Sequence, residues 1–220
     1  MAGRPGPPGG ARGVPIVVPD TESGGQGGVQ VNGGVAANTR RQLRPTDVKR
    51  LNRAWRRSTE GRLALILESV TSPFNIGTIF RTAAAFGVER IWLAGNATPP
   101  TTQKAQKTAL GTDRLVAWEE PVAAVTAVQA ARQDGFTVVA VELSGDAVPL
   151  HEAPLGGPVC LALGGEDHGC SPALLEAADA ACYIPQVGRV GSFNVGIAAA
   201  IAMAEARRRE WAAPPAGDGP

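Results

Sequence analysis

Three short segments gather the polar side chains and glycines that could bind a ligand or take part in chemistry. They are residues 72–87, 161–172 and 183–202. In the first segment, Asn75 falls in the opening turn of an expected helix, where it could cap backbone N–H groups or hold a ligand. Gly77 and Arg81 fall on the side of this helix opposite its apolar stripe. An arginine there is usually a surface residue, so Arg81 alone predicts no site.

The second segment joins two glycines to three titratable residues. Gly164 and Gly165 directly follow an apolar run, and glycines there let a ligand approach the backbone closely. Glu166 could accept hydrogen bonds from loop N–H groups or bind a ligand. His168 has no partner cluster, and the Glu-Asp-His run lacks the spacing of metal ligands, so we expect no metal. The chain also lacks the G-x-G-x-x-G and P-loop patterns of nucleotide sites.

The third segment links a short apolar strand to an alanine-rich helix. Ser192 or Asn194 is placed to cap this helix, and the alanines allow close packing of another backbone. Capping and packing leave Gly188, Arg189 and Gly191 without a structural reason.

The elements that position these segments alternate between strands and helices. The apolar run Leu63–Leu67 is typical of a strand buried on both faces of a sheet. Pro73 and Gly87 bound the first helix. Further strands are expected at Arg90–Leu93, Leu115–Trp118, Phe136–Glu142, Pro158–Leu163 and Ala181–Ile184, and further helices at Pro121–Gln133, Pro172–Ala178 and Phe193–Trp211. This order predicts an α/β fold with a mostly parallel sheet and helices on both faces, whose ligands gather beyond the strands' carboxyl ends.

The parts of the chain differ in composition. We expect a disordered Gly/Pro-rich tail over 1–38, a basic arm over 39–62, a folded domain over 63–212 and a frayed tail over 213–220. Residues 40–62 include nine basic and two acidic residues, so this segment has a formal charge of +7, whereas the whole chain has a net charge of +1. This asymmetry is typical of a polyanion-binding arm. A helix over 47–57, capped by Thr46, would present Lys49, Arg50, Arg53, Arg56 and Arg57 on one face.

Cysteine usage and hydropathy bear on the compartment. Cys160, Cys170 and Cys182 are odd in number and lack close pairing, which indicates neither a disulfide framework nor a zinc site. No apolar stretch reaches the ~18 residues of a membrane span, and the N-terminus lacks an apolar signal region. These features predict a cytoplasmic protein without a membrane partner.

Together the three segments resemble the signature motifs of the SpoU/TrmH-type RNA 2′-O-ribose methyltransferases, of the SPOUT superfamily. The first resembles N-x-G-x-x-x-R-T-A, with Asn75, Gly77, Arg81, Thr82 and Ala83. The second resembles G-x-E-x-x-G-x-S, with Gly164, Glu166, Gly169 and Ser171. The third resembles I-P-M-x-G-x-V-x-S-L-N-V-S, with Ile184, Pro185, Gly188, Val190, Ser192, Asn194 and Val195, while Gln186, Phe193 and Gly196 depart from it.

The resemblance implies a C-terminal deep trefoil knot and a homodimer whose active site combines residues of both subunits. It implies S-adenosylmethionine as cofactor and transfer RNA or ribosomal RNA as substrate. The residues that would bind the cofactor are Leu163, Gly164, Gly165, Ile184, Gln186 and Phe193. The arm residues that would bind RNA are Arg50, Arg53, Arg56 and Arg57.

The resemblance also assigns catalytic roles to Arg81, Asn75, Glu166, Ser192 and Asn194. A guanidinium group resists deprotonation, so the expected task of Arg81 is to bind a phosphate and stabilise the developing alkoxide. Asn75 and Glu166 would orient Arg81 or the ribose. Two other functions remain open: a non-catalytic RNA-binding protein that keeps the knotted fold, and a different α/β enzyme with a nucleotide cofactor.

Overall fold

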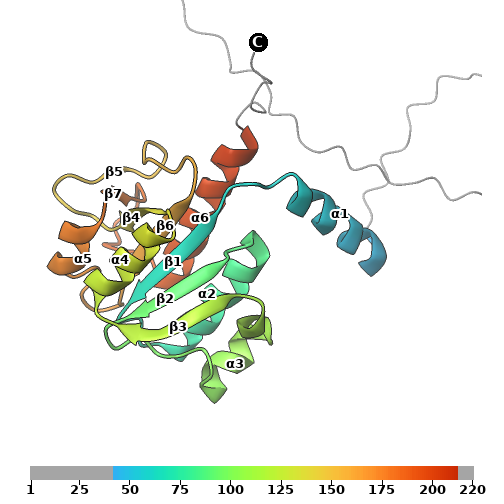
Figure 1. Cartoon of the computed structure of the whole chain (residues 1–220), viewed down its shortest axis with the longest axis horizontal. Helices are drawn as coiled ribbons and strands as arrows, with labels where there is room; N and C mark the ends of the chain where they lie inside the picture. The colour runs from blue at the N-terminus through green and yellow to red at the C-terminus, as the bar shows by residue number, and fades with distance from the viewer. Residues whose placement is uncertain (1–41, 213–220) are drawn as a thin grey trace, which may run out of the picture. The chain divides into compact units, whose positions relative to one another are not determined.

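The structure, a computed structural model, describes residues 42–212 and divides them into two units, of which the second begins at Gly61. The tails predicted over 1–38 and 213–220 lie outside the described residues. Figure 1 shows the elements of both units with their labels.

The first unit contains one helix, α1 (Pro45–Arg57). It begins one residue before Thr46, so the predicted Thr46 cap is wrong. Pro45 occupies the first turn, and Arg44 precedes the helix without a capping side-chain bond. Proline is favoured there because its φ angle already suits a helix and its missing N–H is not needed.

The second unit is built on a sheet of seven strands, all paired in parallel. The strands are β1 (Leu63–Glu68), β2 (Arg90–Ala94), β3 (Ala117–Val122), β4 (Thr137–Val141), β5 (Val148–Pro149), β6 (Val159–Gly164) and β7 (Ala180–Tyr183). Their order in the sheet is β3-β2-β1-β6-β4-β7-β5. From β1 the chain continues to β2 on one side of the sheet, and from β6 it continues to β7 on the other side. These opposite directions place a topological switch point between β1 and β6.

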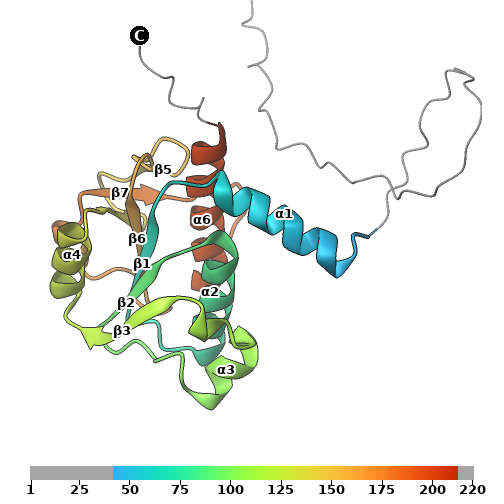
Figure 2. The same ribbon diagram turned by 45° about the vertical axis from the view of Figure 1, so that its right-hand side comes forward.

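Helices cover both faces of the sheet, as predicted. The helices of this unit are α2 (Pro73–Phe86), α3 (Gln103–Ala109), α4 (Ala124–Gln133), α5 (Pro172–Ala177) and α6 (Val195–Ala212), with a 3₁₀ turn at Thr112–Arg114. In Figure 2, α2 and α6 lie on one side of the sheet and α4 on the other. Strand β1 shows why both faces are covered. Leu63, Leu65 and Leu67 belong to the core beneath α2 and α6, whereas Ala64 and Ile66 belong to the core beneath α4.

Several predictions along the chain are wrong in position, and the short strand β5 and the helix α3 were not predicted. Thr102 caps α3 by accepting a hydrogen bond from the Ala105 N–H. The third strand begins two residues later than predicted and continues to Val122, so Pro121 lies in a strand rather than at a helix start. A residue without an N–H is tolerated because β3 is an edge strand.

A buried arginine joins the C-terminal helix to the residues just before β1 and at the end of α2. The Arg207 side chain donates to the carbonyls of Gly61 (2.6 Å), Phe86 (2.9 Å) and Gly87 (3.1 Å), and to the Glu210 carboxylate (2.7 Å). It therefore ties α6 to the end of α2 and to the chain entering β1. None of the helices between residues 42 and 212 has the length and apolar character needed to cross a bilayer.

Candidate active site

The segments that follow β1 and β6 meet at the switch point. The two strands run side by side, with Glu68 paired to Gly164 at their carboxyl ends. A Cβ on Gly165 would lie 2.3 Å from the Ser69 carbonyl oxygen, so only glycine permits this approach. Ser69 itself adopts a left-handed conformation (φ 56°), which turns the chain sharply from β1 toward α2.

Glu166 links the second segment to the first. Its Oε1 accepts hydrogen bonds from the Asn75 side-chain amide (2.7 Å) and the Ser72 N–H (3.3 Å). Its Oε2 accepts from the Thr71 N–H (3.3 Å). The predicted role of Glu166 as an acceptor from loop N–H groups is confirmed, and the donors come from the loop that leads into α2.

These bonds also set the charge of Glu166. Burial alone would raise the pKa of the Glu166 carboxyl. The hydrogen bonds from the Asn75 amide, from its own backbone N–H, and from Thr71 and Ser72 outweigh burial and lower its pKa from the usual value. The carboxylate is therefore held in its charged form as a fixed acceptor.

Asn75 is also hydrogen-bonded to the third segment. The Asn194 side-chain amide donates to the Asn75 Oδ1 (3.0 Å), while the Asn194 Oδ1 accepts from the N–H groups of Gly196 (3.0 Å) and Ile197 (3.3 Å). Of the two predicted caps of α6, Asn194 makes the bonds, and the helix begins two residues after the predicted start at Phe193. We call Glu166, Asn75 and Asn194 the polar relay, because their side chains join all three segments in one chain of hydrogen bonds.

Two carboxylates at strand ends hold the loop after β6. Ser171 N–H donates to Glu68 Oε2 (2.8 Å), and Cys170 N–H donates to Glu142 Oε2 (2.9 Å). The loop folds back tightly, since Gly169 N–H donates to the Gly165 carbonyl (3.0 Å). A Cβ on Gly164 would lie 1.9 Å from the carbonyl carbon of Gly169, so bare backbone forms this wall.

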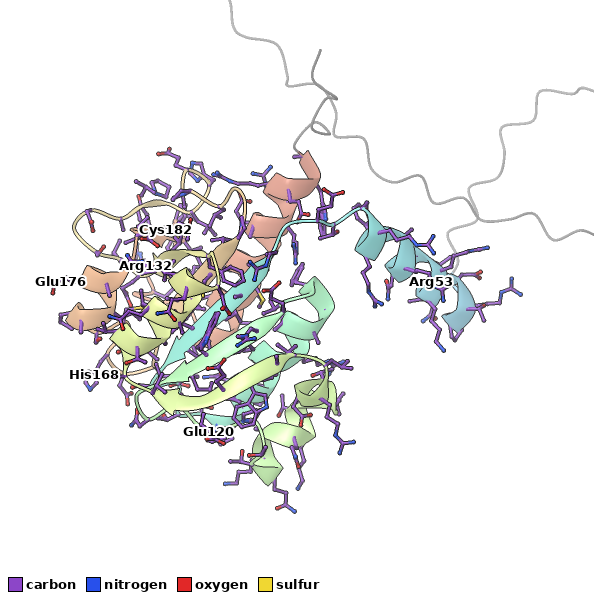
Figure 3. All side chains as sticks on the ribbon, viewed as in Figure 1. Arg53, Glu120, Arg132, His168, Glu176 and Cys182 are labelled. Atoms are coloured by element: carbon purple, nitrogen blue, oxygen red, sulfur yellow. The ribbon has the colours of Figure 1, made fainter. Side chains whose placement is uncertain are left out.

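A cavity of about 750 Å³ lies beyond the carboxyl ends of β4, β6 and β7. All six residues expected to bind the cofactor line it: Leu163, Gly164, Gly165, Ile184, Gln186 and Phe193. Three of the residues expected to be catalytic also line it: Glu166, Ser192 and Asn194. His168 lines it too and lies beyond the strand ends in Figure 3, exposed to solvent.

The two remaining catalytic candidates lie outside the cavity wall. Asn75 reaches the cavity through Glu166 and Asn194, and only 4% of its surface is exposed. Arg81 lies further along α2, is exposed, and has no hydrogen bond or ion pair within residues 42–212. The structure therefore brings four of the five catalytic candidates together and leaves Arg81 apart.

Sequence reasoning missed Glu142, which lines the cavity at the end of β4. The predicted strand Phe136–Glu142 ends at this residue, to which no role was assigned. A carboxylate at the carboxyl end of a parallel strand is the available signal, since ligands gather there. Residues 42–212 contain no cluster of three or more side chains suited to a metal ion.

Arg50, Arg53, Arg56 and Arg57 lie on α1 in the first unit, and all four are exposed. Asp47 accepts hydrogen bonds from Arg44 (3.3 Å) and Arg50 (3.2 Å). The side chain of Arg53 projects from the helix in Figure 3. The remaining three arginines of the set make no ion pair within the described residues.

The fold and cavity define an α/β protein with a cavity at the carboxyl edge of a parallel sheet, lined by glycine-rich loops. The sequence profile of the SpoU rRNA Methylase family matches residues 62–204, and the chain belongs to this family. The predicted family and the predicted fold class are confirmed. The trefoil knot stays a prediction.

Relatives with known names extend this comparison. An uncharacterized tRNA/rRNA methyltransferase of Synechocystis sp. is 34% identical over 164 residues, which cover 74% of this chain and 60% of that protein. The tRNA (guanosine(18)-2′-O)-methyltransferase of Thermus thermophilus is 34% identical over 149 residues, with 67% and 75% covered. The chain spans about 60% of the length of the first curated relatives that it matches.

A solved structure is similar in fold. The AdoMet-bound rRNA methyltransferase from Sinorhizobium meliloti superposes with a TM-score of 0.64 at 28% identity, over 76% of this chain and 70% of that one.

Proposed function

We propose that the chain transfers a methyl group from S-adenosylmethionine to a ribose 2′-hydroxyl of transfer or ribosomal RNA. The observation that carries this proposal is the polar relay at the rim of the cavity, which joins the three segments that resemble the family motifs. The names of the relatives support the substrate class, since they include 2′-O-methyltransferases that act on transfer RNA and on ribosomal RNA.

The cavity suits the proposed cofactor in size and in lining. Its volume lies within the range of roughly 300–1,000 Å³ found for small-molecule sites. Gly164 and Gly165 offer backbone without side chains, and Ile184 and Phe193 offer apolar contacts. S-adenosylmethionine would supply the reactive methyl group once it is bound there.

Arg81 would act on the RNA rather than on the cofactor. It is exposed and makes no hydrogen bond within the described part of the chain, so its five N–H donors are available to a phosphate. A bidentate guanidinium–phosphate contact fixes the neighbouring ribose and favours the developing alkoxide charge. Asn75 and Glu166 would hold the ribose in line for attack, and Ser192 and Asn194 would hold the loop beside it.

A homodimer would complete the site, because Arg81 does not line the cavity of its own chain. Exposed apolar side chains on the segments around α2 and α6 support such an interface: Phe74 is 65% exposed and Ile197 49% exposed. Light scattering should give twice the chain mass. Mixing Arg81→Ala with Asn194→Ala subunits should restore up to about a quarter of the activity if sites are shared between subunits. No recovery would place each active site within one chain.

The basic helix α1 would bind the RNA backbone. Replacing Arg53 and Arg56 with alanine removes two exposed cations and should lower the slope of log affinity against log salt by about 1.5. The cofactor affinity should not change. Equal losses of RNA and cofactor affinity would contradict this role. We place the reaction in the cytoplasm, where these RNAs occur and where the three free cysteines would stay reduced.

Mapping of 2′-O-methylated positions tests the proposal. Total RNA is incubated with the protein and S-adenosylmethionine, and nucleotides that become resistant to alkaline cleavage are identified. Arg81→Ala should abolish transfer and keep cofactor affinity within about threefold. Arg114→Ala, which changes another exposed arginine without an ion pair in the described residues, should keep transfer. RNA binding with neither cofactor binding nor transfer would favour the non-catalytic alternative.

A further inference from the structure

Glu142 is a cavity residue to which neither the motifs nor the polar relay assign a role. It follows β4 and lines the cavity beside the loop of Gly164–Gly169. We propose that the Glu142 carboxylate recognises the two adjacent hydroxyls of the cofactor ribose. This inference rests on the proposed function, because it names the part of S-adenosylmethionine that the residue binds.

The carboxylate is fixed in place at both of its oxygens. Oε1 accepts a hydrogen bond from the Leu143 N–H (3.0 Å), and Oε2 accepts one from the Cys170 N–H (2.9 Å). The backbone N–H of Glu142 donates to the Cys182 carbonyl (2.8 Å). The group is therefore held between the ends of β4 and β7 and the loop after β6, and ligand binding would need little further ordering.

Within residues 42–212, each oxygen retains one unused acceptor site. A carboxylate offers about four acceptor positions, two on each oxygen, and the protein occupies one on each. Glu166 differs, because its Oε1 already accepts from both Asn75 and Ser72. Asp167 also lines the cavity, but it is exposed and makes no hydrogen bond within the described residues. Glu142 is thus the fixed carboxylate with matching free positions on both oxygens.

The neighbouring glycine packs closely against one side of this carboxylate, at Oε2. Gly169 has a φ of 65°, and a Cβ there would lie 2.1 Å from Glu142 Oε2. Any other residue at this position would displace the carboxylate or the loop. The side chain of Glu142 is therefore part of the cavity wall, with its position set by the loop that resembles the second motif.

Two adjacent acceptors of this kind match two adjacent O–H donors. The vicinal hydroxyls of a ribose form such a pair, and hydrogen bonds to an ionised acceptor are about twice as strong as neutral ones. Each such bond should change affinity by about 10- to 100-fold. A deoxyribose loses one donor and leaves one Glu142 oxygen without its ligand partner. The ammonium group of the cofactor is the competing donor, and the test separates it from the hydroxyls.

The test measures binding rather than turnover. Isothermal titration compares S-adenosylhomocysteine with its 2′-deoxy and 3′-deoxy analogues. The unaltered protein should bind each deoxy analogue about 10-fold or more weakly. In Glu142→Ala the preference for the ribose should fall below about threefold, whereas Asp167→Asn should keep it. Glu142→Gln keeps one acceptor oxygen and should lose the preference for one hydroxyl, which preserves the test if the alanine variant does not fold.

Two results would overturn the inference. If Glu142→Ala weakens all three ligands by the same factor and keeps the preference for ribose, the residue only positions the loop or binds the ammonium group. If Asp167→Asn removes the preference instead, the wrong carboxylate has been assigned. Failure of the unaltered protein to bind S-adenosylhomocysteine at all would refute the proposed cofactor, an outcome distinct from loss of ribose preference.

Discussion

Asn75 is the central member of the polar relay, and one substitution there tests the relay directly. Asn75→Asp keeps the shape of the side chain but replaces the amide donor by oxygen. A carboxylate oxygen would then lie at the position now 2.7 Å from Glu166 Oε1. Two charges at that distance repel by roughly 6 kcal/mol at an effective dielectric constant of 20. A pair of carboxyls that shares one proton is lower in free energy than a pair in which both are charged.

The cost of that proton gives the expected loss of stability. Protonating a carboxyl of ordinary pKa costs about 3–4 kcal/mol at neutral pH, since each pH unit corresponds to about 1.4 kcal/mol. Glu166 is exposed on one side, and screening by water lowers the expected loss to about 2–3 kcal/mol. The protonated pair regains a hydrogen bond in place of the Asn75 amide.

The sign of the pH dependence follows from proton counting. At neutral pH the folded variant binds one more proton than the unfolded chain, so its free energy of unfolding falls as pH rises, by up to about 1.4 kcal/mol per unit. The deficit relative to the unaltered protein should therefore shrink to under about 1 kcal/mol near pH 5. Asn75→Ala removes both hydrogen bonds without adding charge, so its loss of about 2 kcal/mol should be similar at both pH values.

Urea denaturation followed by circular dichroism measures these differences near pH 7 and near pH 5. The lowered pKa of Glu166 means that its own stabilising bonds are lost only as pH falls through that lowered value, so the comparison stays above this range. Asn96→Asp, an exposed asparagine in the turn after β2, is the matched control and should change stability by under about 0.5 kcal/mol. A deficit of Asn75→Asp that does not depend on pH would refute the reasoning.

Three further predictions concern the packing that supports the site. Arg207→Ala should lower the free energy of unfolding by about 3–5 kcal/mol because it breaks a buried network. Arg208→Ala, whose exposed side chain pairs with Glu205, should lower it far less, and equal losses in urea melts would contradict this. Gly77→Ala should cost about 1–3 kcal/mol because its Cβ would lie 2.5 Å from the Ala105 carbonyl oxygen, and an unchanged melting curve would show that α3 yields. Burial raises the pKa of Cys182 to about 11, and its two fellow cysteines are also buried, so a thiol reagent at about pH 8 should label none of them until the protein unfolds.

The loops of the site were more predictable than the surfaces that support them. Glycine placement and cap residues mark Gly164, Gly165 and Asn194 in the sequence because their backbone geometry permits few other residue types. Gly77 was expected on the polar side of its helix, yet it is buried against α3. A helical repeat shows which residues share a face but not which second helix packs on it. Helix α3 is short and carries no apolar stripe, so its presence could not reveal that contact.

The partners of the charged groups were also hidden from the sequence. Glu166 was expected to accept loop N–H groups, but its donors lie more than ninety positions earlier in the chain. No role was predicted for Glu142, because a carboxylate at a strand end is common. Only the fold shows that it lies beside the loop after β6. Such pairings depend on strand order, and the order β1-β6-β4 does not follow from periodicity.

The same helix, α6, holds α2 at both of its ends. At the start of α2, Asn194 bonds to Asn75; at its end, Arg207 bonds to the carbonyls of Phe86 and Gly87. Between these points a Cβ on Gly196 would lie within 3.5 Å of the Thr78 side chain, so the two helices pack closely. The direction of α2 is therefore fixed by contacts that do not involve Arg81. The proposed contact of Arg81 with RNA would therefore leave the packing of α2 beside the cavity unchanged.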